Sequence, residues 1–226
     1  MGIAIHPIHL GLDRCYVIQD KGVIMVDAGF PKESKAFKQA ISGNSINPRE
    51  IQLLVLTHGH FDHVGSARDI QEITGARIAI HRAEKEWVER VLLMWPPAVT
   101  TWGHMLRGVL KPLTPLLFRF PATQVDMVLG DEGLSLAEYG IPGKVIHTPG
   151  HTSGSVSVLL ETGDAFVGCM AHNGLPFRLS PGLPVFAEDL EQLRQSWQLL
   201  LGQGAKTIYP AHGKPFSADA IRKALS

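Results

Sequence analysis

The chain contains 226 residues, of which 45% are hydrophobic, so it can bury a sizeable core and lacks the composition of a disordered protein. Its 21 Lys and Arg residues balance its 21 Asp and Glu residues, so no overall basic field attracts a nucleic acid. The length favours one domain over residues 1–226.

The N-terminal part of the sequence predicts an antiparallel meander. Its first residues lack the basic region and apolar run of a secretory signal, so we expect a cytoplasmic protein. Short apolar runs separated by turn residues predict strands over 3–10, 15–19 and 23–26. The last run ends at Asp27-Ala28-Gly29, where Asp27 can accept hydrogen bonds from nearby amides. We interpret Asp27 as a structural residue at this edge of the sheet.

A helix expected over 33–42 is followed by a buried strand over 51–56, which ends in an unusual loop, Thr57-His58-Gly59-His60-Phe61-Asp62-His63-Val64-Gly65. The loop holds three of the chain's 11 histidines. Side chains alternate along an extended segment, so His58 and His60 project to one side, while the turn presents Asp62 and His63 to the other. Imidazoles and carboxylates bind zinc and similar divalent metals, so the loop predicts a site for two adjacent ions.

The next segments predict helices over 64–73 and 83–93 around a strand over 77–80. If Asp62 and His63 open the first of these helices, its positive end favours bound anions near the metal loop. His81 follows the strand, and we interpret it as a pocket-wall or hydrogen-bonded histidine rather than a ligand.

Residues 91–121 form an apolar segment with no acidic residue. Pro96, Pro97, Pro112 and Pro115 argue against one long helix, and three basic residues argue against an integral membrane segment. Such a surface is expected to be buried against something. We weigh an apolar helical insertion packed on the core, a substrate-pocket wall or lid, a homodimer contact and a membrane-surface patch.

The second half places single histidines in rigid turns after short strands. One turn is Thr148-Pro149-Gly150-His151, after a strand over 144–147, and the other is Pro210-Ala211-His212-Gly213. Strands over 156–160 and 165–169 form a hairpin that ends at Cys169, and a helix is expected over 190–201. Both halves contain strands followed by helices, which fits two packed sheets with helices outside. Cys15 and Cys169 are expected as free thiols or a metal ligand.

In these motifs the chain resembles the metallo-β-lactamase superfamily, in a branch similar to glyoxalase II and the lactonases. The matching motifs surround Asp27, His58 to His63, His151, Cys169 and His212, and they occur in the expected order over most of the chain. The resemblance implies an α/β fold, a four-layer αββα sandwich of two mixed sheets flanked by helices.

The resemblance also implies two sets of metal ligands. The first ion would be held by His58, His60 and His151, and the second by Asp62, His63 and His212. The family commonly has a bridging aspartate at the position of Cys169; Asp164, five residues earlier, is too far along the strand to replace it. Either Cys169 ligates the second ion without bridging, which we prefer, or it is a buried bystander. A thiolate favours zinc over manganese.

The implied activity is that of a metal-dependent hydrolase with one or two zinc ions, iron or manganese being less favoured. Zinc-bound hydroxide would attack an ester, thioester or lactone of a small apolar substrate, with Asp62 orienting the hydroxide and moving its proton. His172 either reaches the substrate or is structural, and Ser153 and Ser155 are turn residues. Alternatives are a β-lactamase-type amide hydrolase, a redox or dioxygenase member, and a non-catalytic metal-binding relative.

Overall fold

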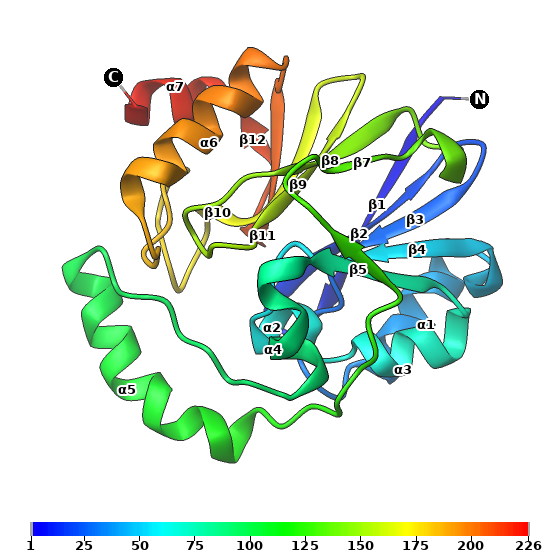
Figure 1. Cartoon of the computed structure of the whole chain (residues 1–226), viewed down its shortest axis with the longest axis horizontal. Coiled ribbons are helices and arrows are strands. Elements are labelled where there is room, and N and C mark those ends of the chain that lie inside the picture. Colours follow the sequence, from blue (N-terminus) through cyan, green and yellow to red (C-terminus); the bar gives the residue numbers. More distant parts are fainter. Residues whose placement is uncertain (1, 226) are drawn as a thin grey trace.

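The computed structural model describes residues 2–225 and contains two six-stranded mixed sheets (Figure 1). The first sheet has the order β1 (Ala4–Leu10), β2 (Asp13–Gln19), β3 (Val23–Val26), β4 (Ile51–Val55), β5 (Arg77–His81), β6 (Met127–Leu129). The second has the order β12 (Phe216–Ser217), β11 (Thr207–Gly213), β10 (Asp164–Asn173), β9 (Val156–Leu160), β8 (Gly143–His147), β7 (Leu134–Ser135). The predicted N-terminal meander is confirmed, because β1, β2 and β3 pair antiparallel.

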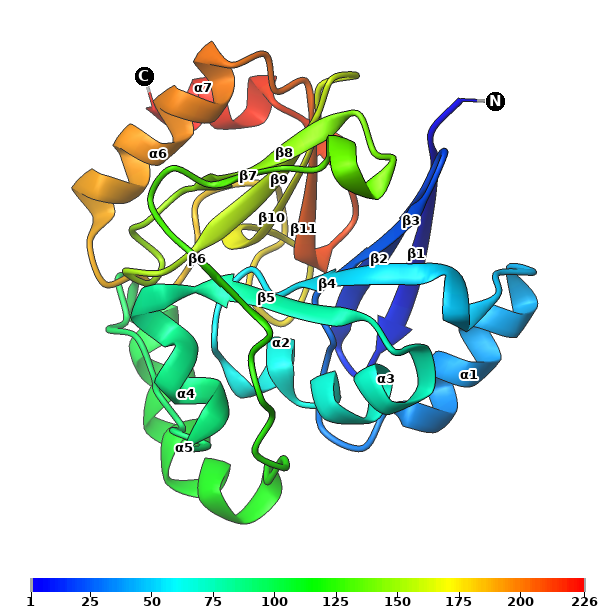
Figure 2. The ribbon, with the colours of Figure 1, turned by 45° about the vertical axis from the view of Figure 1, so that its right-hand side comes forward.

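Helices lie around the two sheets. They are α1 (Ser34–Gly43), α2 (Phe61–Val64), α3 (Ala67–Thr74), α4 (Lys85–Glu89), α5 (Thr101–Leu117), α6 (Leu190–Gly202) and α7 (Asp219–Leu225). Figure 2 shows α1 and α3 beside the first sheet, and α6 and α7 on the far side of the second. The expected αββα arrangement is therefore confirmed.

The alternation of side chains along strands explains these layers. In β2, Tyr16 and Ile18 join the core between the two sheets, whereas Cys15 and Val17 join the core under α1 and α3. A third core lies between the second sheet and α6, where Trp197 is completely buried. Each strand thus contributes apolar side chains to both of its faces, as expected of sheets covered on two sides.

Several expected helices differ from those observed. The helix predicted over 64–73 is two helices, α2 and α3, and the one over 83–93 is reduced to α4 after a short 3₁₀ turn. Residues 91–121 are not one long helix, since the stretch around Pro96 and Pro97 is non-helical, but Pro112 and Pro115 do not break α5 as expected, because the helix continues through both. Most of α5 is solvent-exposed, so few packed side chains constrain the helix near these prolines. Figure 1 shows α5 as a curved helix at the side of the molecule.

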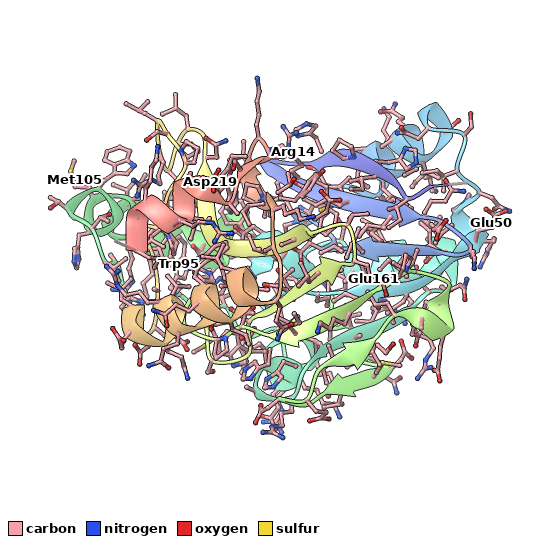
Figure 3. All side chains as sticks on the ribbon, turned by 90° about the horizontal axis from the view of Figure 1, so that it is seen from above. Arg14, Glu50, Trp95, Met105, Glu161 and Asp219 are labelled. Carbon is pink, nitrogen blue, oxygen red and sulfur yellow. The ribbon has the colours of Figure 1, made fainter. Side chains whose placement is uncertain are left out.

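The expectation that 91–121 buries its apolar surface is only partly met. Along α5, several large apolar side chains remain exposed: Trp102, Met105, Val109, Leu113 and Leu116. Figure 3 shows Met105 at the outer edge of the molecule. Within the described part of the chain, no helix combines the length and apolar character needed to span a bilayer. The homodimer contact stays a prediction.

Candidate metal centre

Loops and strand ends at one edge of the sandwich bring the seven predicted ligands together. His58 to His63 follow β4, His151 lies in the β8–β9 loop, and Cys169 and His212 lie in the neighbouring strands β10 and β11. The parallel pairing of β10 with β11 explains how residues 43 positions apart meet. Neither cysteine forms a disulfide, as expected.

The histidines assigned to the first ion surround one point. Single ligand atoms of His58, His151 and Cys169 lie within 4.8 Å of one another. Nδ1 of His60 is 3.3 Å from Nε2 of His151. Nδ1 of His151 is 2.9 Å from the Phe186 carbonyl and can donate to it, which leaves Nε2 directed into the cluster. The imidazoles therefore present nitrogens to a common position.

The second predicted set surrounds an adjacent point. Nε2 of His63 lies 3.2 Å from Sγ of Cys169, and Nε2 of His212 lies 3.5 Å from Oδ2 of Asp62. Ligand atoms of His63, Cys169 and His212 also lie within 4.8 Å of one another. Cys169 thus belongs to both groups, and its sulfur lies between them.

Asp27 has a more direct role than sequence reasoning assigned to it. Its carboxylate accepts hydrogen bonds from the backbone amide and hydroxyl of Thr57, at 2.7 and 2.9 Å. It also lies 2.8 Å from Nδ1 of His63, which can donate to it and so directs Nε2 toward the cluster. Asp27 adopts φ 61°, in the left-handed region that Asp tolerates better than most residues. Its predicted structural role therefore includes orienting a candidate ligand.

Two buried carboxylates at the site were not anticipated. Asp13, at the start of β2, shares a group with Asp62, His63 and His212. Glu84 accepts hydrogen bonds from Gly59 N, Gly154 N and the Thr152 hydroxyl. In the sequence both residues fit solvated turn or helix positions, and only the three-dimensional structure shows that they are completely buried.

Burial and neighbouring charge set the protonation of the candidate ligands. Burial lowers the pKa of His60 to about 3 and the pKa of His58 well below its usual value, which keeps both imidazoles neutral. Burial opposes ionisation of Cys169, but His212 and His63 hold the thiol pKa well below its usual value. Burial raises the pKa of Asp13 to about 7, although His212 opposes the rise.

These residues fit a divalent metal centre. Nε2 of His58 and both oxygens of Asp13 are buried without hydrogen-bond partners among the described residues. Buried polar atoms normally have partners, so the orphaned donor atoms favour a bound cation. Imidazole nitrogens with carboxylate oxygens and a thiolate sulfur form a donor set that suits zinc.

An apolar pocket opens onto this cluster. Its walls include Phe61 and apolar residues from distant segments: Leu12, Phe30, Met94, Trp95, Pro96, Leu110, Phe118, Pro176, Phe177 and Phe186. The other lining residues are candidate ligands and His172. Five of these residues, Met94, Trp95, Pro96, Leu110 and Phe118, belong to the segment 91–121, which agrees with its predicted role as a pocket wall. A larger depression lined by Glu132, Lys144 and Lys206 contains none of the candidate ligands.

The remaining predicted polar residues have separate surroundings. His172 is buried and lines the pocket, with neither ring nitrogen hydrogen-bonded among the described residues. His81 lies 3.0 Å from Asp131 and stacks on His147, as expected of a histidine with partners. Ser155 accepts a hydrogen bond from the Thr152 amide, which fits a turn residue.

Comparison with known proteins agrees with this geometry. Residues 13–212 match the family described as the metallo-beta-lactamase superfamily. The chain belongs to this superfamily. It is 26% identical over 237 residues to a Bacillus subtilis (strain 168) protein named probable metallo-hydrolase YflN, an alignment covering 98% of this chain and 88% of that protein. That name supports a hydrolase of the superfamily.

Solved structures share the fold at lower identity. The chain is similar to the BLEG-1 B3 metallo-beta-lactamase, with a TM-score of 0.68 and 20% identity over 97% of this chain and 95% of that one. It is also similar to TTHA1623 in a di-iron-bound form, with a TM-score of 0.67 and 20% identity over 96% of this chain and 97% of that one. At these identities the likeness concerns the fold.

Proposed function

We propose that this member of the superfamily is a zinc-dependent hydrolase that cleaves an ester, thioester or lactone of a small apolar substrate. The observation that carries the proposal is the position of the candidate ligands at the base of an apolar pocket. An acyl group can occupy the pocket while its carbonyl faces the metal centre. The proposed ligands are His58, His60 and His151 for one ion, and Asp62, His63, His212 and Cys169 for the other.

Zinc held at this centre would lower the pKa of a bound water to about 7 and polarise the substrate carbonyl. Asp62 is suited to handle the proton of the attacking water. Burial tends to raise its pKa, but His63 and His212 outweigh burial and hold that pKa below its usual range. The Asp62 carboxylate is therefore ionised at neutral pH and can accept a proton, then pass it to the leaving group.

The pocket walls exclude water and position the acyl group. Phe61 stacks on Phe118 with ring centroids 4.5 Å apart, and Trp95 packs edge-on against Phe186 at 5.8 Å. Trp95 is further fixed because its indole nitrogen donates to the Thr114 hydroxyl at 3.1 Å. A rigid aromatic wall favours an apolar acyl chain over a charged one. Trp95 is labelled in Figure 3.

A substrate screen tests the proposal. The purified protein, loaded with zinc, is assayed against esters, thioesters, lactones, β-lactams and phosphodiesters, with the metal content measured in parallel. We expect one to two zinc ions per chain and the highest kcat/KM on an acyl ester, thioester or lactone. The variant His58→Ala should lose bound zinc and should also lose activity. The control variant His104→Ala, which lies outside the site, should keep its zinc and its activity.

Three results would contradict the proposal. The first is purification without chelators that yields no bound metal. The second is preferred cleavage of β-lactams, which would favour an amide hydrolase. The third is iron-dependent oxygen uptake, which would favour a redox enzyme.

A further inference from the structure

Asp13 is a completely buried carboxylate to which the proposed function gives no role. It is the first residue of β2, and neither of its oxygens has a hydrogen-bond partner among residues 2–225. An ionised carboxylate buried without partners is strongly unfavourable unless a cation compensates it. The surroundings of Asp13 therefore indicate where such a cation would lie.

The atoms closest to Asp13 are candidate ligands of the second ion. Oδ1 lies 3.0 Å from Nδ1 of His212, and Oδ2 lies 3.9 Å from Nε2 of His63. One ligand atom each from Asp13, Asp62, His63 and His212 lies within 4.8 Å of the others. Ligand atoms around one zinc ion, each about 2.0–2.2 Å from it, are separated by about 3–3.5 Å. The 3.5 Å between Nε2 of His212 and Oδ2 of Asp62 matches that spacing, and the 3.9 Å between Nε2 of His63 and Oδ2 of Asp13 is slightly longer.

Asp13 and Asp27 differ in their hydrogen bonds, and the difference distinguishes a metal ligand from a carboxylate that orients one. Asp27 is satisfied by protein donors alone, since Thr57 donates to it twice and His63 Nδ1 lies at hydrogen-bond distance. Asp13 lies 3.0 Å from Nδ1 of His212, slightly farther than the 2.8 Å between Asp27 and His63, and this ion-pair contact is not aligned as a hydrogen bond. An orienting carboxylate would be expected to make that hydrogen bond.

We propose that Asp13 is a ligand of the second metal ion and supplies the carboxylate that the cysteine at position 169 does not. The second ion would then be held by Asp13, Asp62, His63 and His212, with the Cys169 sulfur adjacent. Carboxylate oxygen complements imidazole and thiolate donors on zinc, and its negative charge offsets that of the ion. The inference rests on the proposed function, because it concerns the same metal centre.

Zinc titration of the metal-stripped protein tests this inference, with Asp13→Asn compared against wild type and Asp27→Asn. Loss of an outer carboxylate weakens metal binding by about 10–100-fold, and loss of a ligand should exceed this range. We expect Asp13→Asn to bind the first zinc normally and the second more than 100-fold more weakly. A loss of second-site affinity of about 100-fold or less would overturn the inference, because an outer carboxylate accounts for a loss of that size.

Two further measurements distinguish a metal ligand from a residue that only stabilises the fold. In X-ray absorption spectra of protein loaded with two zinc ions, Asp13→Asn should show one oxygen neighbour fewer than wild type at about 2.0–2.2 Å from zinc. Unchanged zinc coordination would contradict the proposal that Asp13 is a ligand. Without metal, Asp13→Asn should melt at the same or a higher temperature than wild type, whereas Asp27→Asn should melt lower. A lower melting temperature for Asp13→Asn would instead indicate a structural role.

The outcome for the wild-type protein separates the two proposals. Wild type that binds no zinc contradicts the proposed function itself. Wild type that binds one zinc and hydrolyses acyl substrates retains the proposed function and overturns only the role of Asp13.

Discussion

Replacing Glu84 with glutamine tests whether one carboxylate fixes both loops that carry the first-site histidines. Oε2 of Glu84 accepts from the Gly59 amide, between His58 and His60. Oε1 accepts from the Gly154 amide at 2.9 Å and from the Thr152 hydroxyl, both close to His151. Glutamine keeps the shape of the side chain but replaces one acceptor oxygen with a donor.

The size of the effect follows from the lost acceptor. Whichever way the amide is turned, its NH₂ group meets the amide of Gly59 or Gly154, which remains buried without a partner. Such a group costs about 1–3 kcal/mol. For a protein of this length, 1 kcal/mol shifts the melting temperature by about 2–4 °C, so we expect a fall of about 2–12 °C. Displacement of the loops should also weaken zinc binding by about 10–100-fold.

Thermal unfolding measured by circular dichroism, with Glu86→Gln as the control, is the appropriate assay. Glu86 lies two residues away, but its side chain is 66% exposed and pairs with Arg90 at 3.4 Å. Surface ion pairs of this kind contribute at most about 1 kcal/mol. A melting temperature of Glu84→Gln within 1 °C of the control, with unchanged zinc affinity, would refute the proposed linkage of the two loops.

Three further changes have defined outcomes. Cys169→Asp should raise manganese occupancy of the second site, measured by elemental analysis, because a carboxylate is a harder ligand than a thiolate; unchanged stoichiometry and activity would make Cys169 a bystander. Burial lowers the pKa of His60 to about 3. Below about pH 6.5 the unfolded metal-free chain therefore binds a proton at His60 that the folded chain does not bind, so the free energy of unfolding decreases as the pH is lowered. Between pH 7 and 5, urea denaturation of metal-free His60→Gln should therefore lose about 2 kcal/mol less than wild type, and equal losses would contradict this. Trp95→Ala should raise KM for a long-chain acyl ester about tenfold while leaving KM for an acetyl ester within twofold, and equal changes in both would argue against an acyl pocket.

The order of elements could be predicted from sequence because local patterns determine it. Apolar runs with turn residues located most of the longer strands of both sheets, but not the two-residue strand β12. The Pro-Gly-His and Pro-Ala-His-Gly turns located two of the histidines. The parallel pairs β3–β4 and β10–β11, and the turn between the antiparallel strands β8 and β9, then bring the ligand-bearing segments to one edge. For this reason the seven predicted ligands lie close together in the structure.

What could not be predicted depends on tertiary environment. Asp13 follows a Gly-Leu turn and reads as a solvated residue, yet its side chain is completely buried. Glu84 sits in a charged stretch that fits an exposed helix, yet it accepts hydrogen bonds from two distant loops. In α5, proline propensity gave the wrong answer at Pro112 and Pro115, because few packed side chains constrain this exposed helix near its prolines.

The chemistry of the pocket limits how selective the enzyme can be. Apart from the candidate ligands, His172 is the one polar residue among the described lining residues, so the walls offer few hydrogen bonds to a distinctive substrate group. Apolar pockets discriminate by only about 10–200-fold for each added or missing methylene, whereas sites that bind a substrate hydroxyl or amide can reject analogues by 10⁴ or more. Selectivity should therefore depend on acyl size and on the position of the carbonyl at the metal centre. A graded series of acyl esters should give a smooth optimum in kcat/KM with chain length. A single substrate preferred by more than about 10⁴-fold would contradict this expectation and would require a polar contact, for which His172 is the candidate among the described lining residues.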